Sequence, residues 1–504
     1  MYRTLVLVGL VLVGSVRLAV AGDPPSFAAV KAQAEKGDAE AQTRLGAMYA
    51  EGQGVKKNLA QALVWYRKAA AQNHPSAQLS LGTLYYRGEG VPKDDAIALR
   101  WFRKAAEREN PAAQQSLGWM YANGEGVSED DVEAVRWYRK AAEQGLPKAQ
   151  FNLGTMYRNG EGVSKDLTEA ARWMRMAAEQ GCAQAQYELA AMHQTGEGVP
   201  KDEAEALRLY RKAADQGYAM AQYGFGLLCA QGEGVPKDDA EATRWIRLAA
   251  EQGHAPAQLC LCRRFLVGAG VWKDPPEAAR WCRMAADQGH APAQHFLGGM
   301  CARGEGVAKD LAEAVRWYRK AADQGFAAAQ HGLGNAYRRG EGVAPDAAEA
   351  VRWWRRAAEQ GDASAQLDLG AAYAQGKGVA KDEAEAVRWW RKAAEQGHAA
   401  AQASLALAYA NGEGVSEDPV EAAVWFRKAA EQGDPESQHN LAVMYGVGAG
   451  VPKDDGQAYL WAYLAVEQGF EDARDTLEKV ASRLTPEEIA DAERRAAEML
   501  PKEE

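Results

Sequence analysis

Tryptophan recurs along this chain at a fixed interval of 36 residues. The column comprises Trp65, Trp101, Trp137, Trp173, Trp245, Trp281, Trp317, Trp353, Trp389, Trp425 and Trp461, and only Leu209 interrupts it. A fixed period of this size is the signature of a repeat array, in which each unit is too small to bury a core and must stack on its neighbours. The period therefore predicts one elongated repeat domain instead of several globular domains.

The first half of each repeat reads as a helix that ends in a tight turn. In the repeat around Trp137, the apolar residues Leu117, Met120 and Tyr121 follow helical spacing. Gly124 comes next, and glycine accepts without steric cost the left-handed conformation that ends many helices. We therefore expect a helix that stops at Gly124.

The second half reads as another helix packed against the first. Asp130 is placed to cap this helix, and Glu133 is placed to reach back to the Asp130 amide, as in a capping box. Gly145 ends the helix. Small residues such as Gly118, Ala134 and Ala141 let neighbouring helices approach closely, while the bulky Trp137 and Tyr138 fill the gaps. Each repeat is therefore predicted to be a helix-turn-helix unit.

Together the repeats predict an all-α solenoid with a cap at each end. Twelve repeats occupy residues 43–474, an N-terminal capping helix lies within 22–42, and capping helices lie within 475–504. One repeat closes unusually, because Glu109 stands in the slot that is glycine in most other repeats. Glutamate disfavours the left-handed conformation and asparagine tolerates it, so we expect Asn110 to take that turn.

The N-terminus predicts export. Residues 1–21 carry the basic Arg3, the uncharged and mostly apolar run Leu5–Val16, and the small-residue cleavage site Ala19-Val20-Ala21, which together form a secretory signal. The apolar run is shorter than the ~20 residues that span a bilayer, and Arg17 ends it. We expect a periplasmic or secreted protein, cleaved after Ala21 and without stable membrane insertion.

The repeat motif resembles that of a known family. The pattern A-x-x-L-G-x-M-Y-x-x-G-x-G-V-x-x-D-x-x-E-A-x-x-W-Y-x-K-A-A-x-Q-G is visible in Ala113–Gly145 and again in Gln294–Gly325. It resembles the Sel-one-like repeat (SLR) family, a branch of the tetratricopeptide-like α-solenoids. The resemblance implies a right-handed superhelical solenoid that serves as a protein-binding scaffold. Members include bacterial periplasmic or secreted proteins that act in signalling, exopolysaccharide control and host contact.

Charge argues against nucleic acid as a partner. The formal net charge is −10, and it becomes −12 when the predicted signal, with its two arginines and no acidic residue, is removed. Basic residues are spread over every repeat and form no patch for a phosphate backbone.

The motifs that would carry catalysis are missing or have a simpler explanation. Gly88 and Gly90 imitate part of a phosphate-binding fingerprint, but they follow a predicted helix and suit a tight turn. No H-E-x-x-H, C-x-x-C or S-x-x-K sequence occurs. His295 and His331 lie one repeat apart, about 8–10 Å between helices, whereas a shared zinc needs both nitrogens within about 2.1 Å. We expect no enzyme activity, no cofactor and no metal.

Six cysteines leave two interpretations open. They are Cys182, Cys229, Cys260, Cys262, Cys282 and Cys301. In an exported chain they can form disulfides, and as free thiols they pack well as small hydrophobic residues. If one bridge forms, we expect it between Cys262 and Cys282, which lie on the two helices of one repeat and replace a glycine and an aromatic residue.

Positions that vary between otherwise copied repeats are free of packing duty and available for binding. In the first helix of each repeat, the fifth, ninth and twelfth residues share one face. Aromatic and arginine side chains, which commonly anchor interfaces, recur on this face. The predicted partner-binding residues are Tyr86, Trp119, Phe151, Arg158, Tyr187, Tyr223, His295, His331, Asn335 and Arg338. The alternative is that the aromatic residues fill the space between helices.

The seventh repeat departs furthest from the pattern. Trp272 stands in its turn where most repeats have proline, serine or alanine, and Asp274-Pro275-Pro276 follows. Pro275 suits the first position of a helix. Trp272 is either a local plug or a contact residue.

These features predict an exported, non-enzymatic scaffold that binds a protein or peptide in a concave groove lined by the first helices. Envelope signalling, polysaccharide regulation and host contact are the settings that the resemblance suggests. Two alternatives stay open: an envelope hydrolase, as cysteine-rich relatives have been labelled β-lactamases, and a glycan-binding export scaffold whose aromatic residues stack on sugars.

Overall fold

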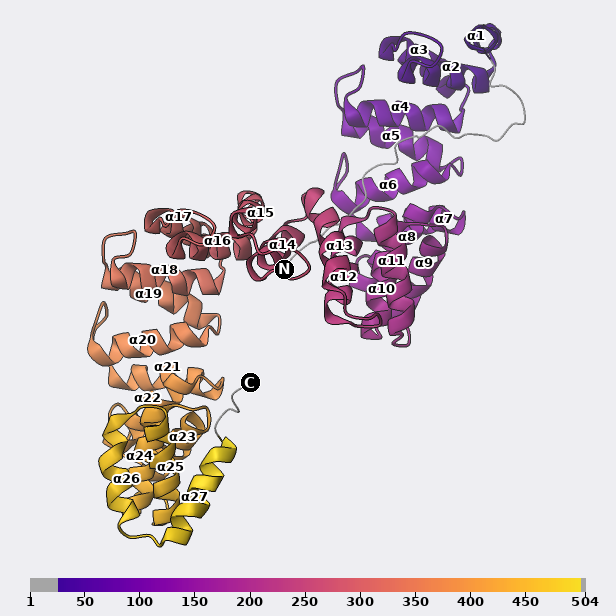
Figure 1. The fold of residues 1–504 in the computed structure, drawn as a ribbon. Coiled ribbons are helices and arrows are strands. Elements are labelled where there is room, and N and C mark those ends of the chain that lie inside the picture. The colour runs from indigo at the N-terminus through magenta and orange to yellow at the C-terminus, as the bar shows by residue number, and fades with distance from the viewer. Residues whose placement is uncertain (1–25, 500–504) are drawn as a thin grey trace. The chain divides into compact units, whose positions relative to one another are not determined.

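The computed structural model describes residues 26–499, and the regular elements in that range are all helices (Figure 1). These residues fall into two compact units, of which the first ends at Gln252 and the second begins at Gly253. No helix within 26–499 is long and apolar enough to cross a bilayer. The predicted signal at residues 1–21 lies outside the described residues.

Unit 1 begins with a single helix and continues with six helix pairs. Its helices are α1 (Phe27–Glu35), α2 (Ala39–Glu51), α3 (Leu59–Ala71), α4 (Pro75–Arg87), α5 (Asp95–Ala106), α6 (Pro111–Asn123), α7 (Asp131–Glu143), α8 (Pro147–Asn159), α9 (Leu167–Glu179), α10 (Ala183–Thr195), α11 (Glu203–Asp215), α12 (Ala219–Gln231) and α13 (Asp239–Glu251).

Unit 2 has six further pairs and a helical end. Its helices are α14 (Ala255–Val267), α15 (Pro275–Asp287), α16 (Ala291–Arg303), α17 (Leu311–Asp323), α18 (Ala327–Arg339), α19 (Ala347–Glu359), α20 (Ala363–Gln375), α21 (Glu383–Glu395), α22 (Ala399–Asn411), α23 (Pro419–Glu431), α24 (Pro435–Val447), α25 (Asp455–Glu467), the 3-10 turn η1 (Glu471–Ala473), α26 (Arg474–Ala481) and α27 (Pro486–Met499). The chain is thus the predicted solenoid of twelve helix pairs. We call the even-numbered helices α2 to α24 helix A and the odd-numbered helices α3 to α25 helix B.

The turn between helix A and helix B forms as predicted, except in one detail. Gly124 ends α6 at φ 68°, and the Asp130 carboxylate caps α7 by accepting a hydrogen bond from the Glu133 amide at 3.0 Å. Glu133 does not reach back to the Asp130 amide, because that amide donates to the Tyr121 carbonyl at 2.9 Å. The Glu133 carboxylate pairs instead with Arg136, 3.1 Å away.

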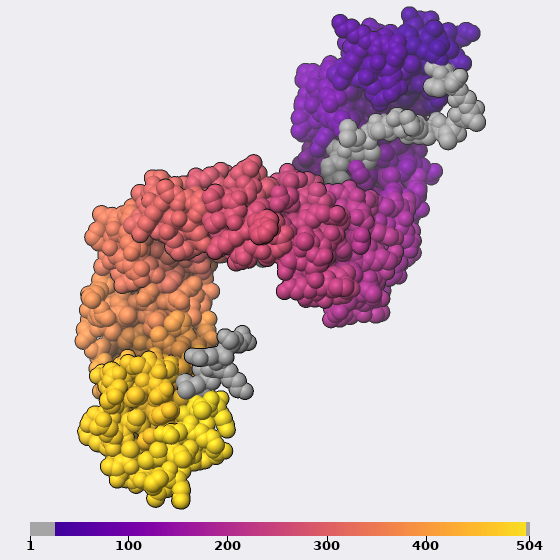
Figure 2. All heavy atoms as spheres, viewed as in Figure 1, coloured from indigo at the N-terminus to yellow at the C-terminus, as the bar shows by residue number. Residues whose placement is uncertain are grey.

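Close approach of the two helices depends on the predicted glycine slot. A Cβ atom on Gly118 would lie 2.7 Å from the Tyr138 ring, so any larger residue would push the ring away. Tyr138 is fully buried, as are Ala134 and Ala141 on the same helix. In the space-filling view the successive helices of each unit are closely packed against one another (Figure 2).

Buried glutamines link the ends of successive helices. In the pair α6–α7, the Gln144 side chain donates to the Gln114 side-chain oxygen at 2.8 Å, and Gln114 donates to the Ala106 carbonyl at the end of α5 at 3.2 Å. The same bridge recurs as Gln72–Gln42, Gln180–Gln150, Gln216–Gln186, Gln252–Gln222, Gln288–Gln258, Gln324–Gln294, Gln360–Gln330, Gln396–Gln366, Gln432–Gln402 and Gln468–Gln438. Each bridge satisfies polar groups that would otherwise be buried alone.

One pair of helices lacks this bridge. Arg108 occupies the glutamine slot at the end of α5, and its guanidinium donates to the Lys104 carbonyl at 3.4 Å. The side-chain oxygen of Gln78 on α4 is therefore buried without a partner.

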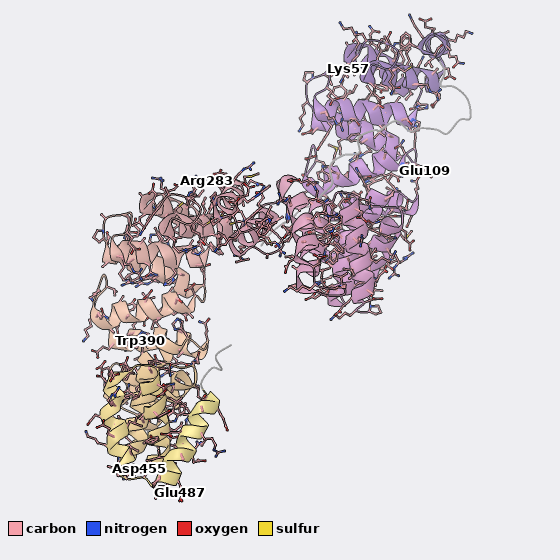
Figure 3. All side chains as sticks on the ribbon, viewed as in Figure 1. Lys57, Glu109, Arg283, Trp390, Asp455 and Glu487 are labelled. Carbon is pink, nitrogen blue, oxygen red and sulfur yellow. The ribbon has the colours of Figure 1, made fainter. Side chains whose placement is uncertain are left out.

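The expectation that Asn110 takes the left-handed turn after α5 is wrong. Glu109 adopts it, with φ 61°, in the short loop before α6 (Figure 3). Asn110 is required elsewhere, because its side chain caps α6 by accepting a hydrogen bond from the Ala113 amide at 2.9 Å. Its own φ is −69°.

The two ends differ from the repeats. The side chain of Ser26 caps α1, and Val30 and Ala34 of this helix are buried. At the other end Thr485 and Glu488 form a complete capping box. The Glu488 carboxylate accepts from the Thr485 amide at 2.8 Å, and the Thr485 hydroxyl accepts from the Glu488 amide at 3.3 Å. Ala492 and Ala496 of α27 are buried.

Candidate partner-binding surface

The fifth slot of helix A lies at the junction between two repeats. Tyr187 on α10 packs edge-on against Tyr210 of α11 and Tyr218, with ring centroids 5.5 and 5.6 Å away. A Cβ atom on Gly224 of the next helix A would lie 3.8 Å from both Tyr187 and Tyr210. A side chain in this slot is therefore partly enclosed by helix B of its own repeat and by helix A of the next.

Phe151, which the sequence predicted as a partner contact, is buried in the structure. It is 3% exposed and belongs to the core cluster that also holds Met174. A phenylalanine ring carries no polar atom that gains from staying in water, so it enters the junction completely. Its assignment as a partner contact is wrong, and the alternative of an aromatic core residue holds for this position.

Tyr187 and Tyr223 stay half-buried in the same slot of the next two repeats. Burial is the main cause that raises the pKa of the Tyr187 hydroxyl, and the nearby Glu188 carboxylate raises it further. Burial also raises the pKa of Tyr218 to about 12. These two hydroxyls are therefore neutral near pH 7, and the hydroxyl of Tyr218 donates to the Met220 sulfur at 3.1 Å.

Tyr86 and Trp119 come from successive A helices and meet at one carboxylate. The Trp119 indole nitrogen donates to the Glu125 carboxylate at 3.1 Å. Burial, followed by a hydrogen bond with Glu125, raises the pKa of Tyr86 to about 12. The Lys93 ammonium lies 5.4 Å from the centre of the Tyr86 ring. Both aromatic rings are half-buried and held in fixed orientations.

Arg158 is held in a similar way. Its guanidinium pairs with the Glu188 carboxylate, so α8 is linked to α10. The arginine side chain stays 35% exposed and the glutamate side chain 19%. We define Tyr86, Trp119, Arg158, Tyr187 and Tyr223 as the unit 1 face.

The predicted residues of unit 2 form a more polar group. His295 packs against Tyr318 and Phe326, with ring centroids 5.4 and 5.6 Å away, and burial is the main cause that lowers its pKa. His331 contacts the Asp368 carboxylate at 2.8 Å and the Asn335 amide at 3.1 Å.

Arg338 is exposed. Its guanidinium lies 6.0 Å from the centre of the Trp354 ring. Within residues 26–499 no group of three or more His, Cys, Asp or Glu side chains is placed to hold a metal ion.

All six cysteines are free thiols in the structure. Cys262 and Cys282 are nevertheless neighbours inside the seventh repeat. Hydrogen bonding with the Cys262 thiol is the main cause that raises the pKa of Cys282, and burial adds to it. The Cys282 thiol also lies 3.4 Å from the Ala293 carbonyl. The predicted bond is not formed, and its two partners lie side by side.

The sequence pattern did not reveal the carboxylates that organise the unit 1 face. Glu125 is a copy of a glutamate found in most of the turns, so nothing marked it as the partner of Trp119 and Tyr86. Glu188 stands in a variable slot that is serine, asparagine, glycine or cysteine in several other repeats. A variable slot beside an aromatic residue is the signal that would have found it.

Comparisons with known proteins agree with this architecture. A family model described as Sel1 repeat matches the chain at residues 39–74, 75–110, 111–146, 147–182, 183–218, 217–254, 255–290, 291–326, 327–362, 363–398, 399–434 and 435–470. No curated protein sequence matches the chain.

Two solved structures are similar over much of the chain. One is a protective antigen present in uropathogenic Escherichia coli strains and displaying an SLR fold. It is 38% identical, the match covers 87% of this chain and 94% of that chain, and the TM-score is 0.67. The other is a Sel1 repeat protein from Oxalobacter formigenes. It is 37% identical, the match covers 61% of this chain and 89% of that chain, and the TM-score is 0.50.

Proposed function

Because the chain belongs to the Sel1 repeat family, we propose that it is an exported scaffold that binds a protein or peptide partner across the unit 1 face. The observation that carries this proposal is how Tyr86, Trp119 and Arg158 are held at the surface. These side chains stand in slots that packing does not require, and carboxylates hold them in place while part of each remains at the surface. A surface ordered before binding loses little side-chain entropy when the partner arrives.

Export and contact with another organism are supported by two independent points. The apolar N-terminal segment and its small-residue cleavage site have the composition of a secretory signal. A similar protein over most of this chain is a protective antigen of uropathogenic Escherichia coli. We place this chain, by the same reasoning, in the cell envelope or outside the cell.

We further propose that the protein acts by binding and not by catalysis. The carboxylates that recur with the period are engaged at the starts of helices, as Asp130 and Asp310 are when they accept hydrogen bonds from Glu133 and Glu313 amides. A catalytic pair needs two acids whose surroundings move their pKa values apart, and copied caps share one environment.

A glycan is the second candidate for the ligand of the same face. Tyr86 and Trp119 present two half-buried rings beside the Glu125 carboxylate. Flat aromatic surfaces next to a hydrogen-bond acceptor also suit a sugar ring.

Site-specific photo-crosslinking in living cells tests the proposal. Thr155 stands on α8, three residues before Arg158, in the slot that is tryptophan on α6, so a photoreactive phenylalanine derivative should fit there. The matched control carries the same group in place of Arg136, whose side chain is 65% exposed on helix B. We expect a protein adduct from position 155 and none from position 136.

Two substitutions then test the residues themselves. Trp119→Thr installs the residue found in the equivalent slot at Thr83 and Thr155, and Tyr187→Leu installs the residue found at Leu79. Both should fold normally, and together they should remove the adduct. An unchanged adduct in the double variant, or equal adducts from positions 155 and 136, would overturn the proposal. An adduct to polysaccharide would favour the glycan alternative.

A further inference from the structure

The turn between α14 and α15 carries the most exposed large apolar side chain among residues 26–499. Trp272 is 93% exposed, and Val267 at the end of α14 is 75% exposed. A tryptophan that plugged a space beneath the turn would be buried, so the exposure of Trp272 rules out the first of the two roles left open by the sequence. The role of a contact residue is the one that remains.

The residues just before Trp272 are apolar in slots where most other repeats have polar side chains. The slot of Val267 holds Glu, Arg, Asn, Thr or Gln in ten other repeats, and the glutamate that follows two residues later in most repeats is Ala269 here. Residues 267–272 read Val-Gly-Ala-Gly-Val-Trp and include no charged side chain. We call this segment the apolar tip.

The backbone of the apolar tip is as regular as that of any other repeat. Gly268 ends α14 at φ 80°, and its amide donates to the Arg264 carbonyl at 2.8 Å. The Asp274 amide donates to the Phe265 carbonyl at 2.9 Å, and the Asp274 carboxylate caps α15. The repeat forms this turn elsewhere with serine or proline in the slot of Trp272, so the fold does not require the tryptophan.

We propose that the apolar tip docks on a lipid bilayer surface, with Trp272 and Val267 entering the interfacial layer. An indole is amphipathic, and tryptophan is favoured where hydrocarbon meets the polar headgroups. Lys273 follows directly, with a flexible stem that can extend its ammonium to lipid phosphates while the indole sits deeper. Attachment of this kind is peripheral and reversible, and it needs no spanning helix.

Other occupants fit the tip less well. A protein partner would have to supply a cavity for a projecting indole, whereas a bilayer adapts to any small projection. A second copy of the chain meeting tip to tip would bury far less than the ~1,200 Å² of a stable interface. A sugar would require several hydrogen-bonding side chains around the ring, whereas residues 267–271 supply none and the Asp274 carboxylate is engaged in capping α15, which leaves Lys273 alone. This inference does not depend on the proposed function of the unit 1 face.

Vesicle binding by the full chain tests the proposal, and the array supplies matched variants. Trp272→Ser installs the residue found in the same slot at Ser128, Ser164 and Ser416. Val447→Asn alters the tip of the twelfth repeat, which has the same uncharged turn with Pro452 in place of tryptophan. Every variant keeps the same N-terminus, so any contribution of the segment Leu5–Val16 is constant.

Two measurements read out contact with the bilayer. The first is co-sedimentation with vesicles of phosphatidylethanolamine and phosphatidylglycerol. The second is quenching of tryptophan emission by brominated lipids, which reports on Trp272 because no other tryptophan among residues 26–499 is exposed and residues 1–21 contain none. We expect the wild type and Val447→Asn to bind and to be quenched. Trp272→Ser should bind about tenfold more weakly and lose the quenching, with unchanged helix content.

Three results would overturn the proposal. The first is a wild-type chain that neither sediments with vesicles nor is quenched by brominated lipid. The second is quenching that Trp272→Ser leaves unchanged. The third is self-association of the wild type, or its binding to isolated cell-wall glycan, that Trp272→Ser abolishes while vesicle binding persists.

Discussion

A single residue at the end of helix B determines whether the buried glutamine near the start of helix A has a hydrogen-bond donor for its side-chain oxygen. In eleven pairs a second glutamine donates to it, and in α4–α5 Arg108 does not. The remaining hydrogen bond of Gln78, to the Ala70 carbonyl, is also long at 3.5 Å. A buried acceptor without a donor costs free energy that the other repeats avoid.

Arg108→Gln should therefore stabilise the protein. We expect the free energy of unfolding of the part of the chain that contains α4 and α5 to rise by about 1 kcal/mol, the usual net value of one buried hydrogen bond. Urea unfolding followed by circular dichroism measures the change. The gain should disappear in a Gln78→Met background, which lacks the acceptor. An equal gain in that background would show that the glutamine bridge is not its source.

Replacing Glu109, whose backbone is in the left-handed conformation, should also raise the free energy of unfolding. The equivalent Gly145 in the next repeat has φ 85°, and a Cβ atom there would meet nothing within 4 Å, so the cost of a side chain in this slot is conformational only. Glu109→Gly should raise the free energy of unfolding by about 1 kcal/mol, because an L-residue is strained at φ 61°. Thermal unfolding measures it. Glu107→Gly in the same loop, where φ is −65°, is the control that should not stabilise.

The spacing between helix A and helix B depends on the sizes of the two side chains that face each other. In six repeats a glycine on helix A faces an aromatic ring on helix B, as Gly118 faces Tyr138. In α14–α15 both sides change together, and Cys262 faces Cys282 in a fully buried contact. Two medium-sized residues there replace one small and one large residue.

This pair should form a disulfide under oxidising conditions. The two thiols are neighbours close enough to interact by a hydrogen bond, and closing a loop of this length stabilises a protein by about 3 kcal/mol. Alkylation of the unfolded protein, with and without prior reduction, should reveal two protected thiols after oxidation and none in the reduced protein. Cys282→Tyr, which restores the aromatic residue, should show no protected pair. Six reactive thiols in the oxidised wild type would contradict the prediction.

Helices and turns could be predicted from the sequence because they depend on local chemistry that each repeat restates. Gly124, Asp130 and Thr485 mark boundaries that the structure places where the pattern indicates. The binding face could be predicted only in part, because burial in the fifth slot depends on what the surrounding helices place beside it. Phe151 sinks beside Met174, while Tyr187 meets two other rings and stays half-buried.

At the scale of the whole molecule, the proposed export determines which surroundings we expect the surfaces to meet. We expect the mature chain to begin at Gly22, because Ala19-Val20-Ala21 supplies the small residues that signal peptidase requires. N-terminal sequencing and intact mass of the exported protein measure this. Ala19→Arg with Ala21→Arg should block cleavage and keep the precursor in the membrane fraction. An intact Met1 on the exported wild type would show that the interpretation is wrong.

The missing glutamine bridge at α4–α5 also has a mechanical meaning. In an array whose units touch mainly their neighbours, a pulling force passes through every pair in series, and the chain gives way first where the links are fewest. Arg108 and Glu109 place that point in the second repeat. We therefore expect a molecule stretched between an anchored end and a moving one to open there at a lower force than at the eleven pairs that keep the bridge.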